Sequence, residues 1–115
     1  MAAVLIIKQG DTWPLLRGNA SDEHGPMPLQ NAVSVTIFLK SGATLITGAC
    51  TVINPPDADG MNWQYKWAAG DTAIAGTYQA EIEIVWDTST TPHEIETVPN
   101  DGTVQVVIEP SLDAA

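Results

Sequence analysis

The chain has 115 residues, of which 44% are hydrophobic, and its four basic and fourteen acidic residues give a formal net charge of −10. This length and hydrophobic content predict one globular domain with a buried core and exclude a disordered chain. The acidic balance excludes a nucleic-acid backbone as natural partner and disfavours an anionic membrane surface, because no cluster of Lys or Arg is present to neutralise phosphate. It favours docking onto a basic surface.

The first third of the chain predicts short extended segments. Val4–Lys8 is rich in β-branched residues and suits a first strand. The opening lacks the basic start and the cleavage site of a signal peptide, so we expect synthesis in the cytoplasm. A second extended run covers residues 13–18, and Pro14, which has no N–H to donate, places this run at a sheet edge or at a crossing between sheets. Residues 22–25 form a turn, and two prolines keep residues 26–29 extended.

The clearest strand is Ala32–Lys40, where alternation directs one set of side chains to the core: Val33, Val35, Ile37 and Leu39. Thr44–Ile53 returns as its partner strand. Cys50 lies in this return strand and is the single cysteine of the chain, so no intrachain disulfide is possible. We expect it to be a small buried apolar side chain.

The segment from Met61 to Trp86 has the pattern of a crossover between two sheets of a sandwich. Its two flanks alternate with period two, one placing Met61, Trp63, Tyr65 and Trp67 on a single face and the other Tyr78, Ala80, Ile82, Ile84 and Trp86. Between them, Asp71 in the position of an N-cap and Gly76 in that of a stop predict one short helical turn near residues 70–75.

The remainder predicts a hairpin and a final strand. Residues 87–92 form the polar tip, Glu94–Val98 the return strand, Pro99–Gly102 a turn and 104–108 the last strand. Short strands with turn signals every eight to twelve residues are typical of an all-β, immunoglobulin-like antiparallel β-sandwich of about 7–9 strands. We expect a single domain over residues 1–110 and a flexible tail over 111–115.

Catalytic chemistry is not indicated. His24 and His93 lie in predicted loops, and no nucleophile motif or metal-ligand spacing accompanies them, so we expect a non-enzyme without a cofactor. Asp57 and Asp59, two apart before Gly60, have the local spacing of a calcium loop. The distal ligands of such a loop are missing, and the same residues suit a plain turn, which is the favoured interpretation.

Four glutamates mark the hairpin: Glu81, Glu83, Glu94 and Glu96. If the hairpin folds about residues 89–90, Glu83 lies opposite Glu96, and two like charges on one solvent face are unfavourable. The stripe is then either a hydrated acidic face or a patch that meets a basic partner.

The four tryptophans allow three interpretations. Core packing is expected for most of them, because Trp63 and Trp67 share a face with Tyr65. Trp13, beside Pro14 near the expected edge, is the candidate interface residue. The third interpretation is a carbohydrate-binding module in which Trp63, Trp67 or Trp13 stacks on a host glycan.

Several short motifs in order also carry a family resemblance. They are Gln9-Gly10-Asp11-Thr12, Asp22 to Gly25 with Pro28-Leu29, Ala32-Val33, Tyr65-Lys66-Trp67, Asp71-Thr72 ahead of Gly76-Thr77-Tyr78, and Pro99-Asn100-Asp101-Gly102. With them the chain resembles the immunoglobulin-like domain at the N-terminus of tailed-phage baseplate upper proteins, which is also found free-standing among phage and prophage virion proteins.

The resemblance implies a structural virion protein, made in the host cytoplasm, that contacts other virion proteins in many copies and catalyses nothing. We expect no receptor-binding module after Ala115, so the expected location extends from the tail or baseplate to the head–tail junction, with capsid decoration as the alternative. We expect the contacts at Trp13, Pro14, Glu81, Glu83, Glu94 and Glu96, and no nucleic acid or membrane as partner.

Overall fold

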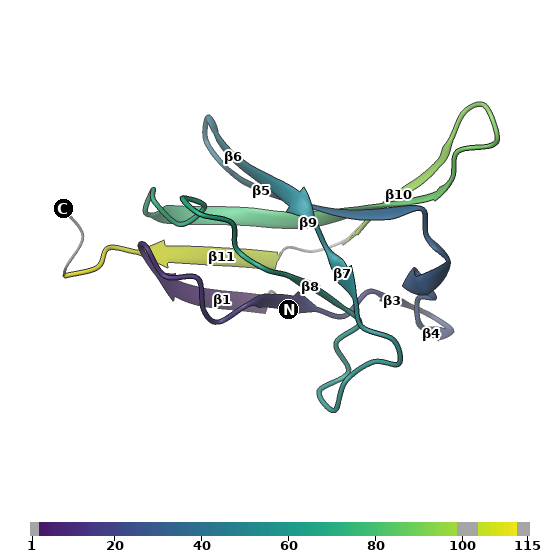
Figure 1. Ribbon diagram of the computed structural model, residues 1–115, viewed down its shortest axis with the longest axis horizontal. Coiled ribbons are helices and arrows are strands. Elements are labelled where there is room, and N and C mark those ends of the chain that lie inside the picture. Colours follow the sequence, from purple (N-terminus) through teal and green to yellow (C-terminus); the bar gives the residue numbers. More distant parts are fainter. Residues whose placement is uncertain (1–2, 99–103, 113–115) are drawn as a thin grey trace.

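The computed structural model describes residues 3–98 and 104–112, and these residues form an all-β sandwich (Figure 1). This confirms the predicted fold class. No helix in these residues is long and apolar enough to cross a membrane. The predicted turn at residues 99–102 and the last three residues of the predicted tail lie outside the described residues.

The larger sheet has six strands in the order β1-β11-β9-β5-β6, and β10 also pairs with β9. Their bounds are β1 Ala3–Lys8, β5 Ser34–Ser41, β6 Thr44–Ala49, β9 Gly76–Asp87, β10 Glu94–Val98 and β11 Val104–Glu109. The central strand, β9, pairs with β5 along one edge, and along the other with β11 and then with β10. The pair of β1 and β11 is parallel and the other pairs of this sheet are antiparallel, so the predicted antiparallel pattern holds except at β1.

The second sheet is small and antiparallel, in the order β2-β8-β7. Its strands are β2 Leu16–Gly18, β7 Thr51–Val52 and β8 Trp63–Tyr65. The remaining elements are the ladder of β3 Ser21–Asp22 with β4 Gly25–Pro26 and the 3-10 helix η1 Leu29–Asn31. As predicted from Pro14, the run over residues 13–18 ends in an edge strand, β2.

The core lies between the two sheets. Alternation along β9 buries Ile82 and Ile84, which face Ile37 and Val35 of β5 in the register of the sheet. The second sheet contributes Trp63 and Tyr65, and Trp67 follows them, so the core interpretation is confirmed for the aromatic residues at 63, 65 and 67. Val33 was predicted to face the core, but this is wrong: its side chain is 60% exposed, because it precedes the first residue of β5.

The predicted strand over residues 44–53 is divided between the two sheets. β6 ends at Ala49, the Cys50 N–H donates to the Val35 carbonyl at 2.8 Å, and β7 then pairs with β8. Cys50 is half-buried at this crossing, and desolvation raises the pKa of its thiol to about 12.

The connection from β8 to β9 is a series of turns, so the helical turn predicted near residues 70–75 is misplaced and the short helix of the fold is η1. Gly70 has φ of +84°, and this left-handed conformation interrupts a right-handed helix. The carboxylate of Asp71 points back instead of capping the residues that follow. It accepts hydrogen bonds from the Ala68 N–H at 2.8 Å and from the Tyr65 hydroxyl at 2.5 Å.

The start of β9 has the feature called a tyrosine corner. The Tyr78 hydroxyl donates to the carbonyl of Ile74, four residues upstream, at 2.7 Å. In immunoglobulin-like sandwiches a tyrosine near the start of the sixth strand makes this bond. The order β6-β5-β9-β11 in one sheet and β2-β8-β7 in the other is that of the same architecture.

Candidate interaction surface

The β9–β10 hairpin is rich in acidic residues. All four Lys and Arg residues lie within residues 1–66, whereas nine of the fourteen acidic residues lie within 67–115. Five of them belong to this hairpin: Glu81, Glu83, Asp87, Glu94 and Glu96. None of the ion pairs among the described residues involves them. The connection between the two strands extends beyond the rest of the molecule (Figure 1).

The pairing of the hairpin differs from the predicted one. A register shift between Glu94 and Ile95 places Glu83 opposite Thr97 and Glu96 opposite Ile84, so the predicted pair of Glu83 with Glu96 is wrong. The two carboxylates that do face each other are Asp87 and Glu94. Hydrogen bonds from the hydroxyl and the N–H of Ser89 hold the pKa of Asp87 below its ordinary value.

The shift also divides the glutamates between the two faces of the sheet. Glu81 is exposed and Glu83 half-buried on the outer face, opposite Phe38 and Thr36 of β5. Glu96 instead shares the inner face with its partner Ile84, because one residue of slippage moves a side chain to the other face. Its Oε1 accepts a hydrogen bond from the Trp86 indole at 3.0 Å. Glu96 is therefore a structural acceptor, and the outer acidic surface consists of the exposed Glu81 and Glu94 with the half-buried Glu83 and Asp87.

Trp13 and Pro14 form a separate patch beside the second sheet. The Trp13 side chain is 72% exposed and Pro14 is also exposed. The backbone under them is held in place, because the Trp67 indole donates to the Pro14 carbonyl at 2.8 Å. Trp63 and Trp67 are 7% and 4% exposed, so neither presents a ring face on which a sugar could stack.

The Asp57–Gly60 loop is bound internally. Asp57 Oδ1 accepts the N–H groups of Asp59 and Met61 at 2.9 and 3.0 Å. The Arg17 guanidinium lies 2.7 Å from Asp57 Oδ2 and 3.6 Å from Asp59 Oδ2. Both aspartates of the loop thus pair with the Arg17 cation, and Asp57 also accepts hydrogen bonds from backbone amides. This arrangement fits a plain turn.

The remaining titratable residues do not converge on a reaction centre in the described parts of the chain. His24 and His93 are exposed in separate loops. No group of three or more His, Cys, Asp or Glu side chains in these parts could hold a metal ion. Burial, with the Asp71 hydrogen bond second, raises the pKa of Tyr65 to about 12, and this pair ties β8 to the following turn.

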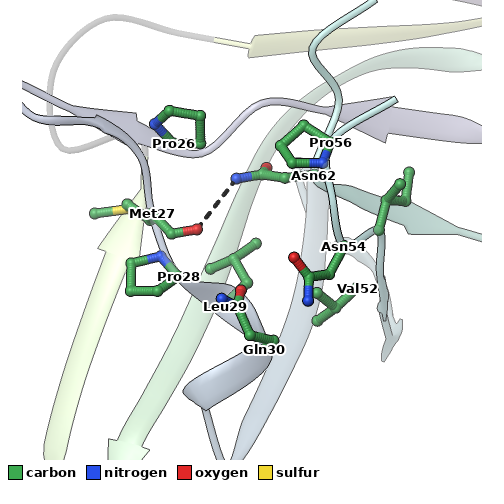
Figure 2. Close-up of a pocket in the computed structure, with 10 residues that line it drawn as sticks. Pro26, Met27, Pro28, Leu29, Gln30, Val52, Asn54, Pro56 and Asn62 are labelled. Carbon is green, nitrogen blue, oxygen red and sulfur yellow. Dashed lines mark hydrogen bonds between the residues drawn. The ribbon is translucent and has the colours of Figure 1, made fainter. Parts of the chain in front are cut away.

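A small pocket lies where the 3-10 helix meets the loop after β7 (Figure 2). Its volume is about 140 Å³, below the roughly 300 Å³ of the smallest usual ligand sites. It is lined by prolines, apolar side chains and amides without an ionisable group: Pro26, Met27, Pro28, Leu29, Gln30, Val52, Ile53, Asn54, Pro56 and Asn62.

Asn62 is the important residue that the sequence pattern missed. Alternation with Met61 and Trp63 puts Asn62 on the opposite, polar face, yet its side chain is only 3% exposed. Its amide oxygen accepts the Ala20 N–H and its amide nitrogen donates to the Ala20 carbonyl, both at 2.8 Å. The amide nitrogen also donates to the Met27 carbonyl at 3.4 Å (Figure 2). Alternation could not reveal this, because β8 begins only at Trp63, and a buried amide beside a buried indole breaks the period of two.

Comparisons of the chain with family models, with curated proteins and with solved structures find no match. The resemblance to the phage baseplate domain therefore stays a prediction from the motifs.

Proposed function

We propose that the chain is a non-enzymatic structural component of a tailed-phage virion, in the tail, the baseplate or the head–tail region, which docks on a larger assembly through edge strands and loops. The observation that carries the proposal is the acidic outer surface of the β9–β10 hairpin. Its carboxylates take part in none of the described ion pairs and follow the β9–β10 hairpin toward the connection that extends beyond the sandwich (Figure 1). Such a surface is complementary to a basic partner.

The positions of the family motifs support a scaffold role. The Gly10 N–H donates to the Thr72 carbonyl at 3.1 Å, and the Thr72 hydroxyl donates to the Asp11 carbonyl at 2.7 Å. These bonds join two of the matching motifs, and the second of these motifs also contains the tyrosine corner. The motif residues thus hold the fold together, and the surface is left to select the partner.

Trp13 provides the second contact that we propose. An exposed indole on an anchored backbone segment is a typical anchor of a protein interface. The carbohydrate alternative needs a strip of exposed rings, and the burial of Trp63 and Trp67 leaves it Trp13 alone.

Mass spectrometry of purified particles tests the proposal, with copies of the chain counted against the major capsid protein. We expect the chain in the particles at a fixed ratio. A small ring-like number fits the tail or baseplate, and a number close to that of the capsid protein fits the decoration alternative. Absence from washed particles would refute the proposal.

A further inference from the structure

The outer edge of β6 is an unprotected sheet edge. In the described part of the chain, three strands of the larger sheet have an unpaired edge: β1, β6 and β10. β1 carries Lys8 beside Glu109, and β10 carries two glutamates and a register shift. β6, with the sequence TLITGA, has no charge and no proline, and it pairs with β5 without a shift. Proteins normally protect a sheet edge with one of these three devices.

The backbone of β6 is oriented to pair with a further strand. The Cys50 N–H points to β5, where it donates to the Val35 carbonyl. Backbone groups alternate in direction along an antiparallel pair, so those of Thr44, Ile46 and Gly48 also point to β5. The N–H and C=O groups of Leu45, Thr47 and Ala49 therefore point away from the sheet.

The sequence of β6 is complementary to itself. In an antiparallel pairing of two copies centred on Thr47, Leu45 of each copy lies opposite Ala49 of the other, and Ile46 lies opposite Gly48. Each large side chain meets a small one, and Thr47 meets its own equivalent, a favourable cross-strand pair. Thr47 also has outward backbone groups, so this register forms regular hydrogen-bonded pairs.

The complementarity of β6 to itself favours a second copy as the occupant of this edge, and the position of the charges permits it. Two molecules of net charge −10 repel each other, and an approach through β10 would bring acidic side chains together. In the β6 pairing, the β9 strands of the two copies lie five strand spacings apart, about 24 Å, which is well beyond the Debye length of about 8 Å in physiological salt. A basic partner would find no carboxylate on β6.

We infer that two copies of the chain associate through β6 about a two-fold axis at Thr47, so that one sheet runs through both molecules. The ladder covers only five residues of each strand, 45–49, so the dimer is weak and depends on concentration. The inference goes beyond the proposed function and does not need it.

A charge-swap experiment tests this dimer. Sedimentation velocity of the parent chain, at concentrations up to about 1 mM, should show the mass rising from 12.2 kDa toward twice that value. Thr47→Lys and Thr47→Glu should each weaken dimerisation about fivefold or more, because like charges then lie opposite each other. An equimolar mixture of the two variants should restore the dimer, because the charges are then opposite.

Thr97→Lys is the matched control, because Thr97 is an exposed threonine on β10, another edge strand of the same sheet, and the net charge changes equally. It should dimerise as the parent does. Circular dichroism should show that all variants are folded. A parent that stays monomeric, a Thr47→Lys variant that dimerises as the parent does, equal weakening by Thr97→Lys, or a mixture that stays monomeric would each overturn the inference. The experiment uses no particles, so its failure leaves the proposed function standing.

Discussion

β8 and β9, the two strands that flank the turns of residues 68–75, differ in how their side chains are buried and in what holds each strand in place. β8 has three residues, and the segment around it is buried at Asn62, Trp63, Tyr65 and Trp67. β9 has twelve residues and alternates regularly, with Tyr78 to Ile84 buried on one face and Glu81 and Glu83 on the other. The short strand depends on side-chain hydrogen bonds and ring packing. The long strand is held by ladders on both edges.

Under the proposed function, this difference separates the residues that stabilise the fold from those that contact a partner. Because β5 on one side and β11 and β10 on the other fix β9, its outer side chains are not needed to hold the strand in place. We therefore expect changes near β8 to lower the free energy of unfolding, and changes on the outer face of β9 to alter contacts alone.

The largest loss of stability is expected for Asn62→Ala. It removes the partner of the buried Ala20 N–H and one of the two donors to each of the Ala20 and Met27 carbonyls, which should lower the free energy of unfolding by about 3 kcal/mol. Urea denaturation measures this. Asn54→Ala, at an exposed amide that lines the same pocket, is the control and should change little. Equal midpoints for the two variants would contradict the structural role of Asn62.

Gly18→Ala should cost about 2 kcal/mol. Gly18 pairs with Trp63 across β2 and β8, and a Cβ at this position would overlap the buried indole. A double-mutant cycle with Trp63→Phe checks the cause, because the smaller ring should relieve part of the penalty. Strictly additive losses would show that the two residues do not interact in this way.

Alkaline pH should weaken the same region. The pKa of Tyr65 is about 12 in the folded chain against 10.0 ordinarily, so the unfolded chain releases this proton first. The contribution is complete below pH 10 and is lost as pH rises through about 12, with about 1 kcal/mol gone at pH 11. Unfolding midpoints from pH 9 to 12 measure the slope, and Tyr65→Phe should flatten it. An equal slope in that variant would assign the effect to other groups, such as Cys50, whose pKa is raised in the same direction.

The sequence predicted the long, regular parts of this molecule and missed the local departures from regularity. Alternation identified the buried faces of β5 and β9, whereas the tyrosine corner at the start of β9 was not predicted. No side-chain type in the hairpin marks the register shift at Glu94, so the face predicted for Glu96 was wrong. The strand over residues 44–53 keeps its hydrophobic pattern through Cys50, which hid the crossing between sheets.

The site was predictable to a similar degree. The acidic content of the hairpin and the exposure of Trp13 followed from composition and from the position of Pro14. The placement of Glu96 and Glu81 on different faces of the sheet could be seen only from the register of the strands. The bond between Arg17 and Asp57 could not be predicted, because the two residues lie forty positions apart in the sequence.

The smallest effect on stability is expected on the outer surface of the β9–β10 hairpin. Substitutions there also test the proposed docking most directly. Glu81→Lys combined with Glu94→Lys should change the free energy of unfolding by less than about 1 kcal/mol, because both side chains are exposed. The matched control reverses two exposed acids elsewhere, Asp11→Lys with Glu23→Lys. The deciding measurement is the number of copies per purified particle by quantitative mass spectrometry. We expect a several-fold loss of copies for the hairpin variant and normal occupancy for the control; equal occupancy of the two variants would contradict the proposed role of the hairpin.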